Sequence, residues 1–346
     1  MTFDIAAVLF QDGVANGAVY VLLATVLVLV FTVTRIVFVP QGDLIAFSAL
    51  TLAAFEAGHT PGTVWILALG AALALILAGG KAAGERNLAG LASAALWFGA
   101  VPAAIVLTAL FLVPKEAPLL WKMAVTCALI TCLGPILYRL VFEPIAAASP
   151  LVLLIAAVAA HFGLSSIGLH VFGAEGVRTP GFAGPPLVVG DLVVTRQTVG
   201  VIASSLVLVG LLSLFFRRSL SGKALLAAAH NRRGAELIGV SATAAGRTAF
   251  IVAGLIGAIS GILIGPMTTL YYDSGFILGL KGFVGAIVGA LAIYPLAALG
   301  ALLVGLVEAF ASFWASAYRD VIVFTLITPV LFWRSLASPH VEEEAE

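Results

Sequence analysis

A few polar side chains interrupt the long apolar stretches of this chain, and they could line a path for a solute. Polar groups are costly in hydrocarbon, so they usually face a cavity or a partner. Glu308 is the foremost candidate, either as a gate or pathway group or as a carboxylate paired with a helix end or hydroxyl. The others are Gln41, Asp43, Thr268, Thr269, Tyr271, Tyr272 and Asp273. His161 and His170 are expected to be packing or interfacial groups.

A basic segment, residues 222–240, suggests a second role, that of a contact surface for a partner. An Arg or Lys at a bilayer centre costs roughly 2.5–3.5 kcal/mol, so this segment must lie on a membrane surface. Cytoplasmic loops carry an excess of Lys and Arg, which predicts the cytoplasmic surface. The basic residues in and around the segment are Arg217, Arg218, Lys223, Arg232, Arg233 and Arg247.

The segment is expected to form one short helix over residues 224–239. Arg232 and Glu236 would lie one turn apart and could pair with each other or with a partner. Gly239 would end the helix as a C-cap. A thin surface that fits a groove would come from the small residues Ala227, Ala228, Ala229, Gly234 and Ala235. The alternative is a surface helix that merely connects two spans.

The elements that must position these residues are membrane helices. Hydrophobic residues make up 62% of the 346 residues and charged residues 10%, and mean hydropathy is +1.17; soluble proteins carry about 25% charged residues. We therefore expect an all-α polytopic integral membrane protein with about 9–11 membrane segments. The candidate segments, judged against a span of about twenty residues, are 14–37, 42–57, 63–79, 91–113, 118–140, 150–172, 197–217, 247–270, 275–293, 296–316 and 319–335. Those at 42–57, 63–79 and 319–335 are short enough to be tilted, broken or re-entrant.

If every candidate crosses, the N-terminus lies outside and the C-terminus in the cytoplasm. Residues 1–337 would form a single transmembrane domain with a cytoplasmic loop at 218–246, followed by an acidic tail at 338–346. The loop at 173–196 combines glycines and prolines with a β-branched run, which predicts an extracytoplasmic strand or hairpin. It would either receive a soluble partner or serve as a connector.

Glycine spacing predicts close helix contacts, because small residues at three- and four-residue steps let backbones approach. The interface could be fixed, or it could slide during a transport cycle. The glycines concerned are Gly254, Gly257, Gly261 and Gly265, with Gly279, Gly282, Gly285 and Gly289 in the next segment. Cys127 and Cys132 have the spacing of neither a metal site nor a disulfide and are expected to face lipid or pack.

The basic segment and the helix after it carry a family pattern. Its parts are Lys223 and Ala224, then Ala227 and Ala229, then Ala235, Leu237 and Gly239, followed by the glycines up to Pro266. Further matches are the run 275–281, Gly300, Gly305, Leu306 and Glu308, with Gly17, Tyr20 and Gly42 in the first half. In these residues the chain resembles the permease subunits of high-affinity branched-chain amino-acid ABC importers.

The resemblance implies half of a translocation pathway for amino acids or related small carboxylates and amphipathic solutes, in the bacterial inner membrane. It also implies partners: a second permease, two cytoplasmic ABC ATPases and an extracytoplasmic solute-binding protein, with lipid around them and no nucleic acid. The ATPases would grip Lys223, Ala224, Ala227, Ala229, Asn231, Arg232, Ala235, Glu236, Leu237 and Gly239. No phosphate-binding loop occurs in the sequence, so the chain is expected to be non-catalytic, without a cofactor or metal, with ATP and Mg bound by the partners.

The chain departs from the family pattern in places, and these departures leave the solute open. An acid usual in the cytoplasmic motif is Asn231, an early turn reads Val39-Pro40-Gln41-Gly42-Asp43, and about thirty residues around 80–113 form an insertion. The alternative functions are a secondary transporter or channel working without ATPases, for which no inverted repeat is visible, and an integral membrane enzyme, for which the histidines are too scattered.

Overall fold

The apolar stretches form helices because a chain in hydrocarbon must satisfy its backbone hydrogen bonds within itself. The computed structural model describes residues 3–84, 86–182, 184–189 and 192–337. The predicted acidic tail at 338–346 lies outside them. The chain is an all-α polytopic membrane protein, and among the described residues eight helices are long and apolar enough to cross a membrane.

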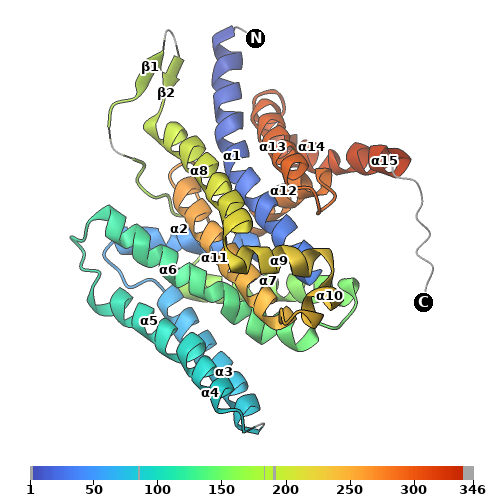
Figure 1. The fold of residues 1–346 in the computed structure, drawn as a ribbon. Helices are drawn as coiled ribbons and strands as arrows, with labels where there is room; N and C mark the ends of the chain where they lie inside the picture. The colour runs from blue at the N-terminus through green and yellow to red at the C-terminus, as the bar shows by residue number, and fades with distance from the viewer. Residues whose placement is uncertain (1–2, 85, 183, 190–191, 338–346) are drawn as a thin grey trace.

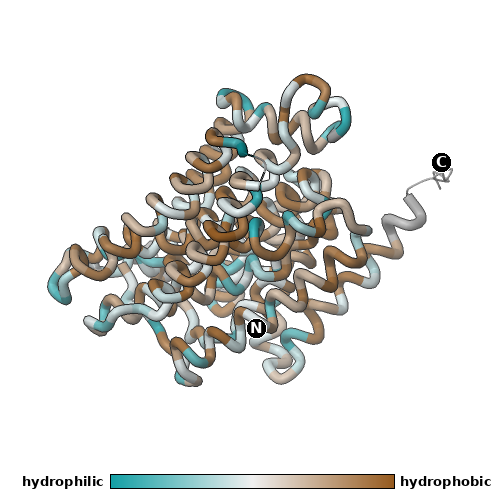
Figure 2. Tube along the Cα trace, turned by 90° about the horizontal axis from the view of Figure 1, so that it is seen from below, coloured by the Kyte–Doolittle hydropathy of each residue, from teal (hydrophilic) through white to brown (hydrophobic). Residues whose placement is uncertain are grey.

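Most of the long helices are uninterrupted. They are α1 (Phe3–Thr34), α3 (Thr63–Gly84), α7 (Pro150–Phe172), α8 (Arg196–Arg218), α11 (Ala242–Ile264) and α13 (Tyr294–Trp314). Two others contain π-helical turns: α4 (Leu88–Ala94) continues through η1 (Ala95–Ala100) into α5 (Val101–Phe111), and α6 (Leu119–Leu137) continues through η2 (Tyr138–Phe142) and η3 (Glu143–Ile145). Figure 2 shows hydrophobic residues along most of these helices and polar ones mainly at the turns.

Shorter elements complete the fold. They are α2 (Gln41–Glu56), α9 (Leu220–His230), α10 (Arg232–Leu237), α12 (Ser274–Val288), η4 (Ser316–Tyr318), α14 (Arg319–Thr325) and α15 (Ile327–Ala337). The stretch at 319–335 is thus broken, whereas the expectation that 63–79 is short is wrong, since α3 runs on to Gly84 over 22 residues. The predicted hairpin is present, with β1 (Leu187–Val189) antiparallel to β2 (Leu192–Val194).

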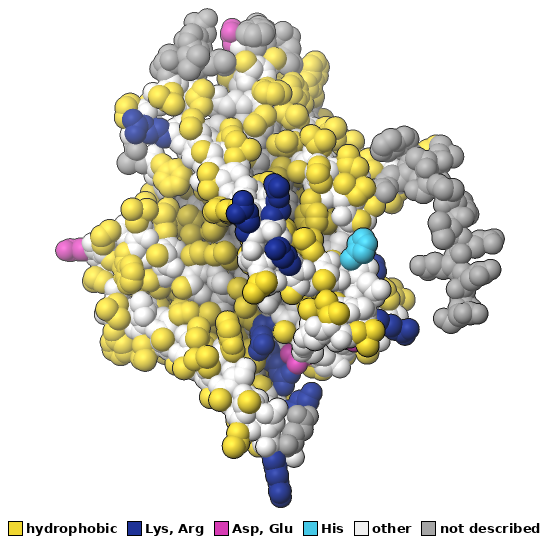
Figure 3. All heavy atoms as spheres, viewed as in Figure 1, with side chains coloured by type: hydrophobic (Ala, Val, Ile, Leu, Met, Phe, Trp, Pro, Cys, Tyr) yellow, Lys and Arg dark blue, Asp and Glu magenta, His cyan; other side chains and the backbone are white. Residues whose placement is uncertain are grey.

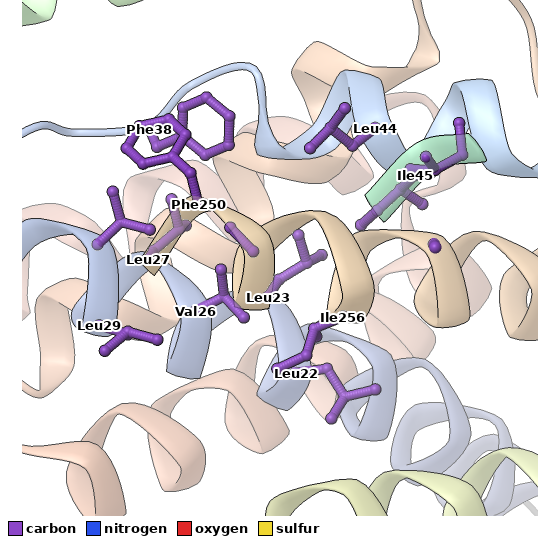
Figure 4. Packing of buried hydrophobic residues seen from close by; sticks show 14 of the residues in the cluster. Leu22, Leu23, Val26, Leu27, Leu29, Phe38, Leu44, Ile45, Phe250 and Ile256 are labelled. Carbon is purple, nitrogen blue, oxygen red and sulfur yellow. The ribbon is translucent and has the colours of Figure 1, made fainter. Parts of the chain in front are cut away.

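The core is built around α1, which packs against α13, α11 and α12 (Figure 1). Glycines allow the closest approaches: a Cβ on Gly305 would lie 2.3 Å from the Gly17 backbone nitrogen. Aromatic and aliphatic side chains fill the remaining space. In Figure 4, Phe38, Phe250 of α11 and Leu27 of α1 lie together, and the two phenyl rings are 4.6 Å apart.

The outer surface of the bundle is apolar. Leu69 and Ile76 of α3 and Leu206 of α8 are each more than two thirds exposed, and hydrophobic side chains cover most of the face in Figure 3. A patch of this extent marks a membrane or protein contact. Lys and Arg gather on the same face from the junction of α8 and α9 downward.

Candidate functional site

The basic segment forms two helices rather than one, so the prediction of a single helix is wrong. Ser219 caps α9 by accepting a hydrogen bond from the Gly222 N–H at 2.8 Å. Asn231, with φ −149° and ψ 100°, ends α9 and caps α10 by accepting one from the Gly234 N–H at 2.9 Å. Asn is a preferred N-cap because its side-chain oxygen satisfies a free backbone donor. The two helices therefore meet at an elbow.

The end of α10 confirms the predicted C-cap. Gly239 has φ +89°, a left-handed conformation that glycine adopts without steric cost. Its N–H donates to the Glu236 carbonyl at 3.1 Å, and the Val240 N–H donates to the Ala235 carbonyl at 2.9 Å. This pair of bonds is the Schellman motif. It fixes how the chain turns from α10 toward α11.

One face of α9–α10 is buried in the chain itself. Gly222, Leu225, Ala228 and Ala235 are buried, and a Cβ on Gly222 would lie 2.3 Å from the Phe215 carbonyl oxygen. Ala235 is only 4% exposed, so in this structure its side chain packs within the chain. Ala224, Ala227 and Ala229 are half-buried.

The other face of α9–α10 is open and mixes basic with apolar groups. Lys223 is exposed, as are Leu226, Leu237 at 88% and Ile238 at 76%. Glu236 is exposed as well, but the side chain of Arg232 lies outside the described residues, and so does its predicted pairing. Exposed leucines beside cations fit a protein contact better than bare solvent.

A second candidate site lies where α2 begins. Gln41 and Asp43 are fully buried, and the Gln41 side-chain amide donates to the Ala253 carbonyl at 3.1 Å. His161 Nδ1 lies 2.9 Å from both carboxylate oxygens of Asp43. The His161 ring also stacks on Phe276, with centroids 4.9 Å apart. His161 is therefore a buried polar partner as well as the packing group expected from the sequence; His170 is exposed.

Gly42 of α2 and Gly275 of α12 let these two helices approach closely at this point. A Cβ on Gly42 would lie 1.8 Å from the Gly275 carbonyl oxygen, and one on Gly275 would lie 2.5 Å from Asp43 Oδ1. A buried Asp needs partners for its charge. The close contact of the two helices and the His161 imidazole supply a polar environment around that carboxylate.

Glu308 belongs to a separate buried network. The Tyr20 hydroxyl donates to Glu308 Oε2 and the Lys281 ammonium donates to Oε1, each at 2.6 Å. Lys281 also lies 3.1 Å from Asp320 Oδ1, and Arg319 Nε lies 3.3 Å from the same atom. Two cations therefore balance two carboxylates. Lys281 lies in the middle of α12 and is only 3% exposed.

The remaining candidates lie in the link between α11 and α12. Thr268, Thr269, Tyr271 and Asp273 are exposed and Tyr272 is half-buried, so the structure groups them with neither Asp43 nor Glu308. The link is tied to the loop before the hairpin. Val177 and Leu270 exchange two backbone hydrogen bonds at 2.9 Å, and the Arg178 guanidinium donates to the Pro266 and Met267 carbonyls at 2.8 and 3.3 Å.

The chain is similar to known transport permeases. The chain is 28% identical over 216 residues to the high-affinity branched-chain amino acid transport system permease protein LivH of Escherichia coli, covering 59% of this chain and 70% of the relative. The LivH protein of Salmonella typhimurium gives the same figures. The permease protein BraD of Pseudomonas aeruginosa is 31% identical over 159 residues, 44% of this chain and 52% of that protein. No protein-family model and no solved structure matches the chain.

Proposed function

We propose that the chain is the membrane subunit of an ATP-driven importer, because it is similar to permeases of high-affinity branched-chain amino-acid transport. With a second, homologous permease it forms the pathway for branched-chain amino acids or related small carboxylates and amphipathic solutes. A soluble binding protein delivers the solute. The observation that carries this proposal is the likeness to LivH, which covers 70% of that permease.

The exposed face of α9–α10 is the docking surface for one of the two ATPase subunits, which bind ATP and Mg. Support comes from its exposed Lys223, Leu226, Leu237 and Ile238, which lie on a well-capped pair of helices. The elbow at Asn231 gives a partner two short helices to contact, α9, which is joined to α8 through the extended residue Ser219, and α10, which leads to α11. This chain contributes force transmission, and the chemistry of ATP hydrolysis takes place in the partners.

The orientation follows from the same surface. Basic segments lie on the cytoplasmic side, which places α9–α10 there in a bacterial inner membrane. The hairpin lies at the other end of α8, and β2 contacts the N-terminal part of α1 (Figure 1). We therefore place the N-terminus and the hairpin loop outside; the cytoplasmic C-terminus stays a prediction.

The solute path involves polar groups at the start of α2. Gln41 and Asp43 are two members of the predicted pathway set that are fully buried at a meeting of helices, with Gly275 of α12 in contact. The exposed Thr268, Tyr271 and Asp273, with Tyr272, would meet the solute earlier, where it leaves its binding protein. Glu308 would contact the solute only if its hydrogen bonds to Tyr20 and Lys281 were broken.

A secondary transporter is the second candidate, and one observation favours it. The short helices α2 and α12 meet inside the fold, and discontinuous helices of this kind line the sites of secondary transporters. Reconstitution into proteoliposomes distinguishes the ATP-driven importer from the secondary transporter. Proteoliposomes with both permeases, the ATPases and the binding protein should accumulate labelled leucine only with ATP. Uptake by this chain alone, driven by an ion gradient without ATPases, would overturn the importer.

A further inference from the structure

A basic cavity lies beside the α9–α10 segment, between the ends of four long helical stretches. The last turns of α3, the α4–η1 stretch, the η2 and η3 turns that follow α6, and the first turns of α11 enclose about 200 Å³. Its ionisable lining residues, among those that the structure describes, are Lys81, Arg139, Arg247 and Glu143. Three cations therefore face one carboxylate, and the cavity attracts an anion.

Arg247 retains donors for such a ligand, whereas Arg139 is largely engaged within the chain. Arg139 forms an ion pair with Glu143 through Nη1, and its Nη2 donates to the Leu77 carbonyl at 3.5 Å, so it contributes positive charge to the cavity wall. Arg247 lies over the Trp97 ring, with 5.6 Å between the guanidinium carbon and the ring centroid. A stacked guanidinium keeps its in-plane N–H groups free, and these match the oxygens of a phosphate.

An apolar groove continues from the cavity toward the membrane interior. It encloses about 460 Å³ between α3 and the η1–α5 stretch, and its walls include Ala71, Leu75, Val106 and Leu107. Phe98 of η1 lines both the cavity and the groove. A ligand that fills the two together therefore has an anionic end and an apolar chain.

We propose that the cavity and groove bind an anionic phospholipid, with the headgroup phosphate among Lys81, Arg139 and Arg247 and an acyl chain in the groove. Basic pockets between membrane helices on the cytoplasmic side attract anionic headgroups. The cavity occupies the face that carries the basic α9–α10 segment, because Thr243 and Arg247 stand in the first turns of α11. A lipid there links the 80–113 insertion to the helix that follows α10.

The test uses the purified full-length chain in neutral detergent after removal of lipid. Binding of phosphatidylglycerol, phosphatidylcholine and inorganic phosphate is titrated by native mass spectrometry, and the melting temperature is followed in parallel. The variants are Lys81→Gln, Arg247→Gln and their combination. Arg86→Gln is the matched control, since Arg86 is exposed in the same turn between α3 and α4 and does not line the cavity.

We expect phosphatidylglycerol to bind more tightly than phosphatidylcholine and to raise the melting temperature. Each cation near an anionic headgroup is worth about fivefold in affinity, so each single variant should lose about fivefold and the double variant roughly thirtyfold, with Arg86→Gln unchanged. Arg247→Lys, which keeps the charge, should retain most of the binding. If Arg247→Gln fails to fold, the exposed Lys81 alone carries the test.

Three results would overturn the proposal. Equal binding of phosphatidylglycerol and phosphatidylcholine would mean that the cations are not used. An equal loss in Arg86→Gln would mean general surface charge and no site. Full protection by inorganic phosphate at the same concentration would assign the cavity to a free anion and leave the groove without a role.

Discussion

Replacing Glu308 with Gln removes the charge that Lys281 faces at 2.6 Å inside the bundle. Removing one partner of a buried ion pair costs about 3–5 kcal/mol, because the other charge is left uncompensated. Here Lys281 keeps Asp320 at 3.1 Å, and the 37% exposure of the Asp320 side chain weakens that second pair by solvent screening. We therefore expect a loss of about 3 kcal/mol, at the low end of the range.

The assay is a double-mutant cycle with Lys281→Met, Glu308→Gln and the combined variant, measured as melting temperatures in detergent. For a chain of 346 residues, a loss of about 3 kcal/mol lowers the midpoint by roughly 4 °C. The combined variant removes both charges, so it should recover part of the loss, with a coupling of about 2 kcal/mol. Arg319 and Asp320, which pair at 3.3 Å, are left unsubstituted in every variant.

Leucine uptake per folded complex is the second measurement on Glu308→Gln. Both carboxylate oxygens of Glu308 are occupied, by Tyr20 and Lys281, so we expect uptake close to the wild-type rate once the amount of folded protein is matched. Strictly additive losses in the cycle would refute the ion-pair reasoning. A collapse of uptake with unchanged stability would instead make Glu308 a pathway group.

Two further predictions concern packing and docking. Gly42→Ala should abolish folded expression, because its Cβ would lie 1.8 Å from the Gly275 carbonyl oxygen, whereas Gly163→Ala, with nothing within 4 Å, should express normally; equal yields by fluorescence-detected chromatography would contradict the contact. Leu237→Asp should uncouple ATP hydrolysis from uptake at unchanged stability, since Leu237 is 88% exposed, whereas Ala235→Arg should lower the melting temperature because Ala235 is buried. A reversed pattern in ATPase, uptake and melting assays would mean that the two faces of α10 are misassigned.

Local features of the fold were predictable because they depend on neighbouring residues. Gly239 ends α10 through bonds that span only a few positions, and hydropathy located the long helices. The break between α9 and α10 at Asn231 also had a local signal, since Asn is a preferred N-cap. The helix-forming residues on both sides of it favoured the prediction of one continuous helix. The end of α3 was misplaced because Gly79 and Gly80 suggest a stop, whereas the helix continues through both.

Contacts between residues that are far apart in the chain could not be predicted from a single sequence. Asp43 and His161 are 118 positions apart, and Tyr20 and Glu308 are 288 apart. Each residue taken alone fits a packing group, an interfacial group or a site equally well, and only the tertiary arrangement brings the partners together. Lys281 shows the same limit: a lone Lys beside apolar residues suggests a helix end, yet it is buried between two carboxylates.

The bonds between the loop before the hairpin and the α11–α12 link have a mechanical consequence. Val177 and Leu270 pair through their backbones, and the Arg178 guanidinium donates to the Pro266 and Met267 carbonyls, so the two peptide segments are tied to each other. A partner that binds the hairpin and tilts these two segments would also displace the first turn of α12. That turn contains Gly275, which lies against Asp43, so a displacement of the loop before the hairpin would change the surroundings of this buried carboxylate.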